Sequence, residues 1–73
     1  MTKAKIVRAR YTKRGLRWGL KFFTGSEQWY VWDDKIKEMC SEEVLELCQR
    51  ELLGYSILAY SEGEHGFTFM VEV

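Results

Sequence analysis

The chain has 73 residues, equal numbers of basic and acidic side chains, and a hydrophobic share of 47%, with aromatic residues making up 15% of the chain. A chain of this length has room for one domain, residues 1–73, that buries only about 60% of its unfolded surface. The hydrophobic content excludes intrinsic disorder, and no uncharged run approaches the roughly 18 residues of a membrane-spanning helix. With no apolar signal core at the N-terminus, we expect a cytoplasmic domain and no membrane partner.

The net charge of zero hides a separation of charge along the chain. Residues 1–24 carry a net charge of +8 and no acid, whereas residues 25–73 carry a net charge of −8. Such asymmetry favours a polyanion-binding side. The alternative is that the basic and acidic segments pair with each other inside the fold.

Alternating side chains predict a first strand over residues 4–11, followed by a basic turn at residues 13–15. Within this strand, Arg8 and Arg10 could contact phosphates. They could also protect a sheet edge from pairing with another chain, because charged side chains are a common edge defence.

Residues 15–34 contain all three tryptophans and are predicted to form two strands joined by a Gly-Ser turn. Successive side chains of a strand point to opposite faces. The strand before the Gly-Ser turn therefore has two different faces. One is apolar, with Leu16, Trp18, Leu20 and Phe22, and the other is mostly cationic, with Arg17, Gly19, Lys21 and Phe23. In the strand after the turn, Trp29 and Val31 alternate with Tyr30 and Trp32, so aromatic rings lie on both of its faces. Either a ligand, a protein partner or a second copy in a homodimer covers the excess, or the fold closes around it.

A helix is predicted between the third and fourth strands, with Ser41 as its N-cap and Gly54 as its C-terminal cap. Two strands follow, over residues 55–61 and 67–73, and the loop between them contains His65. The strand and helix periodicities predict a core of Val7, Ala9, Trp18, Leu20, Phe22, Val31, Leu45, Cys48, Leu52, Ile57, Phe67, Phe69 and Val71.

Three stretches resemble a known family: Gly15-Leu16-Arg17-Trp18, Gly25 with residues 28–35 (QWYVWDDK), and residues 60–67 (YSEGEHGF). They are similar to small phage-type OB-fold proteins of the single-stranded DNA-binding kind, although a longer acidic helix occupies residues 39–53. The resemblance implies a mainly β fold, a five-stranded OB-like barrel (β-β-β-α-β-β) with one helix between strands 3 and 4. It also implies a ligand face on strands 2 and 3, flanked by the loops after strands 1 and 4.

Binding to a single strand requires cations that follow the phosphates and exposed rings on which bases stack. Candidates of both types occur on the expected face and in its flanking loops. The candidate binding residues are Lys13, Arg14, Arg17, Lys21, Trp29, Tyr30, Trp32 and His65. Each tryptophan could instead belong to the core, and His65 could be a solvated loop residue. The expected ligand is single-stranded nucleic acid, DNA rather than RNA.

Catalysis is not expected. A single histidine in a polar turn does not supply a nucleophile together with its general base, and no Gly-rich phosphate loop precedes a helix. Asp33 and Asp34 are adjacent strand residues that point apart, so neither metal nor cofactor is expected. Cys40 and Cys48 are expected to be reduced structural thiols. The alternative function is a small interaction or inhibitor protein, of the kind phages encode, that binds a protein through its aromatic hairpin or acidic helix.

Overall fold

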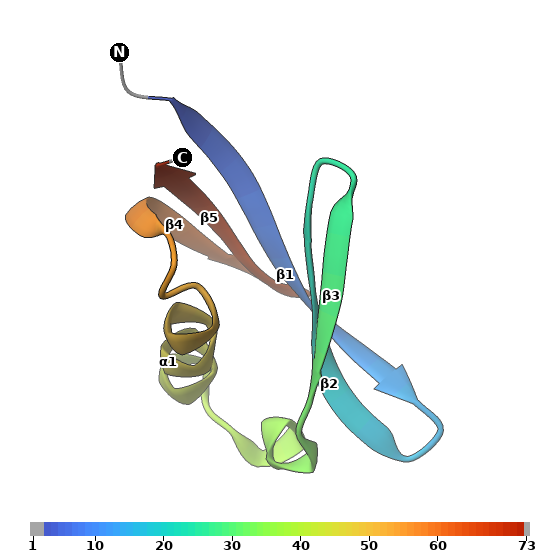
Figure 1. The fold of residues 1–73 in the computed structure, drawn as a ribbon. Coiled ribbons are helices and arrows are strands. Elements are labelled where there is room, and N and C mark those ends of the chain that lie inside the picture. Colours follow the sequence, from blue (N-terminus) through green and yellow to red (C-terminus); the bar gives the residue numbers. More distant parts are fainter. Residues whose placement is uncertain (1–2, 73) are drawn as a thin grey trace.

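The computed structural model describes residues 3–72, which form a twisted antiparallel sheet with a helix packed against one of its faces (Figure 1). The elements in chain order are β1 (Ala4–Arg14), β2 (Arg17–Thr24), β3 (Glu27–Trp32), the 3₁₀ helix η1 (Asp34–Glu38), α1 (Ser41–Glu51), β4 (Ser56–Gly63) and β5 (Gly66–Glu72). The mainly β class and the helix between the third and fourth strands are confirmed. None of the helices within residues 3–72 has the length and apolar character needed to cross a membrane.

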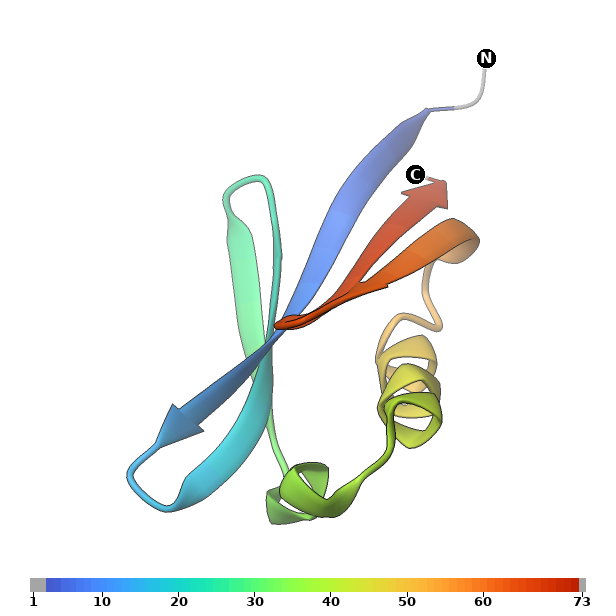
Figure 2. The same cartoon turned by 180° about the vertical axis from the view of Figure 1, so that it is seen from behind.

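The sheet order is β3-β2-β1-β5-β4, and all neighbouring strands are antiparallel. β1 lies at the centre and runs diagonally between the β2–β3 and β4–β5 hairpins, as both views show (Figures 1 and 2). β3 and β4 are the two edges of the sheet, and no pairing joins them among residues 3–72. Closure into an OB-like barrel therefore stays a prediction.

Two glycines set the turns at either end of β2. Gly15 (φ +61°) and Gly25 (φ +55°) are the first central residues of two-residue turns, a backbone conformation that glycine adopts without steric cost. The predicted basic turn at residues 13–15 is wrong in its position, because Lys13 and Arg14 still pair with β2. The turn is formed by Gly15 and Leu16 instead.

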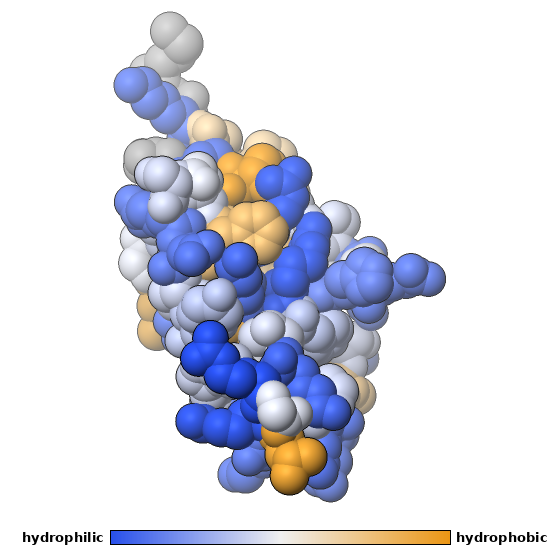
Figure 3. All heavy atoms as spheres, turned by 90° about the vertical axis from the view of Figure 1, so that its right-hand side faces the viewer, coloured by the Kyte–Doolittle hydropathy of each residue, from blue (hydrophilic) through white to orange (hydrophobic). Residues whose placement is uncertain are grey.

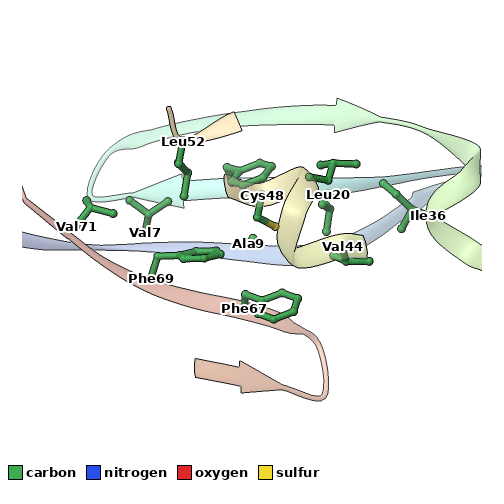
Figure 4. Close-up of a cluster of buried hydrophobic side chains, with 12 residues drawn as sticks. Val7, Ala9, Leu20, Ile36, Val44, Cys48, Leu52, Phe67, Phe69 and Val71 are labelled. Carbon is green, nitrogen blue, oxygen red and sulfur yellow. The ribbon is translucent and has the colours of Figure 1, made fainter. Parts of the chain in front are cut away.

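The hydrophobic core lies between α1 and one face of the sheet, where side chains from β1, β2, β5 and α1 converge (Figure 4). Its buried members are Val7, Ala9, Leu20, Phe22, Ile36, Val44, Leu47, Cys48, Leu52, Phe67, Phe69 and Val71. Trp18, Val31, Leu45 and Ile57, which were predicted to be buried, are only partly buried and pack against this core. Ile36, Val44 and Leu47 are buried although the predicted core does not contain them.

The ends of α1 differ from the prediction. Its N-cap is Cys40 rather than Ser41, because the Glu43 carboxylate accepts a hydrogen bond from the Cys40 backbone N–H at 3.4 Å. Its C-cap is Leu52, so Gly54 is not the cap.

The two last strands also shift relative to the prediction. β4 spans Ser56–Gly63 and β5 spans Gly66–Glu72, and Val73 of the predicted last strand lies outside the described residues. A bulge between Ile57 and Ala59 breaks the alternation of side chains along β4. Ile57 packs against the core, whereas Ala59 is exposed.

Cys48 provides a test of this core. Burial, with a smaller contribution from the charge of Glu51, raises the pKa of its thiol from 9.0 to about 12. The unfolded chain therefore loses this proton at lower pH than the folded chain, so the stability that Cys48 contributes is complete below pH 9 and is lost as the pH rises towards 12. We expect the melting temperature to fall more steeply above pH 9 in the wild type than in Cys48→Ala.

Thiol labelling provides the matched control, because Cys40 is exposed and Cys48 is buried. In the folded protein at pH 8, Cys40→Ala should label slowly, through Cys48 alone, and Cys48→Ala should label rapidly. Equal labelling rates for the two variants would contradict this position of α1 on the sheet.

Candidate nucleic-acid interface

The face of the sheet that points away from α1 is called here the outer face. On β2, Leu20 and Phe22 point into the core, so the alternating side chains of Arg17 and Lys21 belong to the outer face. The strand register carries this alternation onto the neighbouring strands. The outer face of the three strands comprises Arg8, Arg10, Thr12 and Arg14 of β1, Arg17, Gly19, Lys21 and Phe23 of β2, and Gln28, Tyr30 and Trp32 of β3. Seen from the side away from α1, hydrophilic side chains cover most of the surface and hydrophobic ones form separate patches (Figure 3).

Cations and aromatic rings lie next to each other on this face because of the strand register. Lys21 is paired with Arg10 on one side and with Tyr30 on the other. The Lys21 Nζ atom lies 5.9 Å from the centroid of the Tyr30 ring. Basic residues of β1 and β2 thus run beside the aromatic residues of β3, the edge strand.

Trp32 is at the centre of this arrangement. Its ring stacks with that of Tyr30, with centroids 5.6 Å apart and planes 3° from parallel. The guanidinium carbons of Arg14 and Arg17 lie 5.7 and 5.6 Å from the centroid of the Trp32 ring. Gly19 lets the ring approach the sheet, since a Cβ atom there would lie 2.7 Å from Trp32 Cε3 and 2.6 Å from a backbone oxygen.

The basic side chains of the outer face form no ion pairs with carboxylates among residues 3–72. Within residues 3–72, no lysine or arginine lies within 4.0 Å of a carboxylate, and the one contact of a carboxylate at this range is to the His65 Nε2 atom, 4.0 Å from Glu64. Asp33 and Asp34 instead accept hydrogen bonds from the backbone N–H groups of Lys35 and Trp18, both at 3.0 Å. The alternative that basic and acidic strands pair with each other is met by the backbone, since β1 pairs with β5 and β2 with β3. Within residues 3–72, however, no ion pair between a lysine or arginine and a carboxylate accompanies this strand pairing.

Arg8 and Arg10 do not protect a sheet edge, because β1 is the central strand. Arg10 is held in place by its guanidinium group, which donates hydrogen bonds to the Phe67 carbonyl at 2.9 Å and the Ala9 carbonyl at 3.2 Å. Arg8 is exposed on the same face. Both therefore add to the basic side chains of the outer face. The alternation of side chains along β1, together with the pairing of β1 to β2, is the signal that could have identified them as candidate binding residues.

Five of the predicted binding residues come together on the outer face: Arg14, Arg17, Lys21, Tyr30 and Trp32. Trp29 does not join them, because it lies on the side that faces α1. Its ring stacks on Phe22 with a centroid distance of 5.5 Å, and its Nε1–H donates a hydrogen bond to Glu51 at 2.9 Å.

Lys13 and His65 also lie apart from these five. Lys13 pairs with Trp18 on the α1 side of the hairpin, and its Nζ atom lies 5.1 Å from the centroid of the Trp18 ring. His65 lies in the β4–β5 turn, separated from β3 by β1 and β2, and its side chain is 83% exposed. The binding roles of Lys13, Trp29 and His65 stay predictions, and the contacts on the outer face do not support them.

No known protein family, curated protein or solved structure matches this chain. The resemblance to phage-type OB-fold proteins thus stays a prediction from the short motifs. The described residues contain no group of three or more His, Cys, Asp or Glu side chains placed to hold a metal ion.

Proposed function

We propose that this chain is a single-stranded nucleic-acid-binding module without catalytic activity, and that it binds DNA rather than RNA through its outer face. One observation carries the proposal: the cations Arg14, Arg17 and Lys21, which form no ion pairs with carboxylates among residues 3–72, lie directly beside the stacked rings of Tyr30 and Trp32. Tyr30 is exposed and Trp32 is half-buried. Cations and rings that a base can reach are the two components that binding to a single strand requires.

The geometry suggests how a base would enter. In the free protein the arginines of positions 14 and 17 lie over the Trp32 ring, and an exposed cation–π contact contributes about 0.5–1 kcal/mol. A base stacked on an aromatic ring contributes about 1–3 kcal/mol. Exchange of an arginine for a base on Trp32 is therefore favourable, and it frees the guanidinium group to bind a phosphate. Bases in a duplex are already stacked on one another, so a duplex should bind more weakly.

The salt dependence of binding tests the role of the cations. Each phosphate contact to a single strand contributes about −0.7 to the slope of log K against log salt, so replacing Arg17 and Lys21 with glutamine should flatten this slope by about 1.4. Fluorescence anisotropy of a labelled oligo-dT, measured at four or more salt concentrations, gives the slope. Arg50→Gln on α1 is the matched control and should leave it unchanged. A double variant with the wild-type slope would show that these cations do not contact phosphates.

A second candidate is a small interaction or inhibitor protein that binds a protein through its acidic helix. It is favoured by Leu53, which is 81% exposed and lines a hollow with Glu46, Gln49 and Arg50. This surface lies on α1 and the residues that follow it, so Leu53→Ser separates the two candidates. The variant should bind single strands as the wild type does if the outer face is the binding site.

Binding through one face of three adjacent strands does not require closure of the sheet into an OB-like barrel. We place the protein in the cytoplasm, where single-stranded nucleic acid is available. The competing arrangement is a homodimer in which a second copy of the chain packs on Tyr30 and Trp32. Such a dimer would not bind oligonucleotides through these rings.

A further inference from the structure

The tip of the β1–β2 hairpin presents a single apolar side chain to solvent. Gly15 and Leu16 form the two-residue turn, and Leu16 is 90% exposed. The hairpin projects beyond the rest of the molecule, so that this tip is its outermost point at the lower right of Figure 1. A leucine in this position stabilises nothing within the fold.

Cations and tryptophans surround this leucine on both sides of the ribbon. Arg14 and Arg17 face each other directly across the turn. Both lie within 6 Å of the Trp32 ring centroid on the outer face, whereas Lys13 lies over Trp18 on the other face. None of these cations forms an ion pair with a carboxylate within residues 3–72. The tip therefore continues the cationic and aromatic surface of the outer face and ends it with one apolar group.

We propose that the β1–β2 tip recognises a junction between single-stranded and duplex nucleic acid, with Leu16 as a wedge against the terminal base pair. This inference rests on the proposed function, because the single-stranded tail would occupy the outer face beside Tyr30 and Trp32. Apolar side chains, leucine among them, insert between base steps in proteins that distort a duplex. Unstacking is easiest at a junction, because the terminal pair has lost its neighbour on one side. Arg14 and Arg17 would then hold the phosphates on either side of the opened step.

A membrane surface is the other partner that an apolar tip with flanking cations could contact. The area argues against it, since a single myristoyl chain by itself gives only marginal membrane binding and a leucine side chain buries much less apolar surface. A wedge, in contrast, requires only one side chain. The single exposed leucine at the tip therefore favours a nucleic-acid junction.

Two labelled oligonucleotides test the wedge: a dT tail alone, and the same tail joined to a hairpin duplex. The wild type is expected to bind the tailed hairpin about tenfold more tightly, the ratio that 1.4 kcal/mol produces. Leu16→Ser should reduce this preference to less than twofold while the affinity for the tail alone stays the same. Leu53→Ser, the same substitution at another exposed leucine, should keep the preference for the tailed hairpin. In addition, 2-aminopurine in the terminal base pair should brighten when the wild type binds, but not when Leu16→Ser binds.

The outcomes separate this inference from the proposed function. Equal wild-type affinity for the tail and the tailed hairpin would overturn the wedge and leave the outer face as a single-strand site. No binding of either oligonucleotide would overturn the proposed function and the wedge with it. A third outcome would assign the tip to membranes instead. In that case the wild type, but not Leu16→Ser, would sediment with phosphatidylserine vesicles, and the wild type would show no preference for the tailed hairpin.

Discussion

Leu20→Ala is expected to lower the free energy of unfolding by about 2–5 kcal/mol, the range measured when a buried leucine is truncated. Leu20 has no exposed surface and lies on β2 between the central strand and the edge strand, on the side that α1 covers. Its loss would leave a cavity beneath the helix. Because small domains have a total stability of only about 5–15 kcal/mol, the variant should melt at a far lower temperature or fail to fold. Urea unfolding followed by circular dichroism gives the value.

Phe69→Ala should have a similar effect, because Phe69 is fully buried on β5 in the same core. Leu53→Ala is the matched control, since an exposed residue usually changes stability by less than about 0.5 kcal/mol. If Leu20→Ala melted within a degree or two of the wild type, the two faces of β2 would be assigned the wrong way round. Arg17 and Lys21 would then point towards the core, and the proposed interface would be lost.

Trp32→Ala is expected to weaken binding to a single strand by about 1–3 kcal/mol, roughly 5-fold to 150-fold, at every salt concentration. Its ring carries no charge, so the slope of log K against log salt should stay nearly the same. This pattern is the opposite of that expected for the Arg17 and Lys21 double variant, which changes the slope. Anisotropy titrations of labelled oligo-dT over the same salt series measure both quantities.

The melting temperature must be measured with the affinity, because Trp32 also packs on Gly19 and Tyr30. Trp29→Ala is the comparison variant: it loses the stack on Phe22 and the hydrogen bond to Glu51, so it should melt earlier than Trp32→Ala. A Trp32→Ala protein with wild-type affinity would refute the stacking role. A loss of affinity that comes only with a collapse in stability would make Trp32 a structural residue.

Strand alternation alone predicted most of the hairpin. Leu20 and Phe22 were placed in the core, and Arg17 and Lys21 on the opposite face, because a pleated strand allows no other arrangement once one face is apolar. The choice between Trp29 and Trp32 could not be made in the same way, since each parity of β3 contains a tryptophan. The pairing of Trp29 with Phe22, and the helix that covers that face, decide it.

Features that depend on contacts between distant segments could not be predicted. The pairing of β1 with β5 makes β1 a central strand. Arg8 and Arg10 therefore do not protect a sheet edge and instead belong to the cationic outer face. The position of the first turn was missed by two residues, because local composition does not show that Lys13 and Arg14 continue the ladder to β2. That shift is also what exposes Leu16 at the tip.

The most direct test of the outer face as a single-strand site is one titration of the pure wild-type protein with oligo-dT and with a duplex of the same length at low salt. Tryptophan fluorescence is followed, because a base that stacks on Trp32 should quench it. We predict saturable quenching by oligo-dT, with weaker binding of the duplex. No quenching and no change in oligonucleotide anisotropy at tens of micromolar protein would contradict the proposal and favour a protein partner.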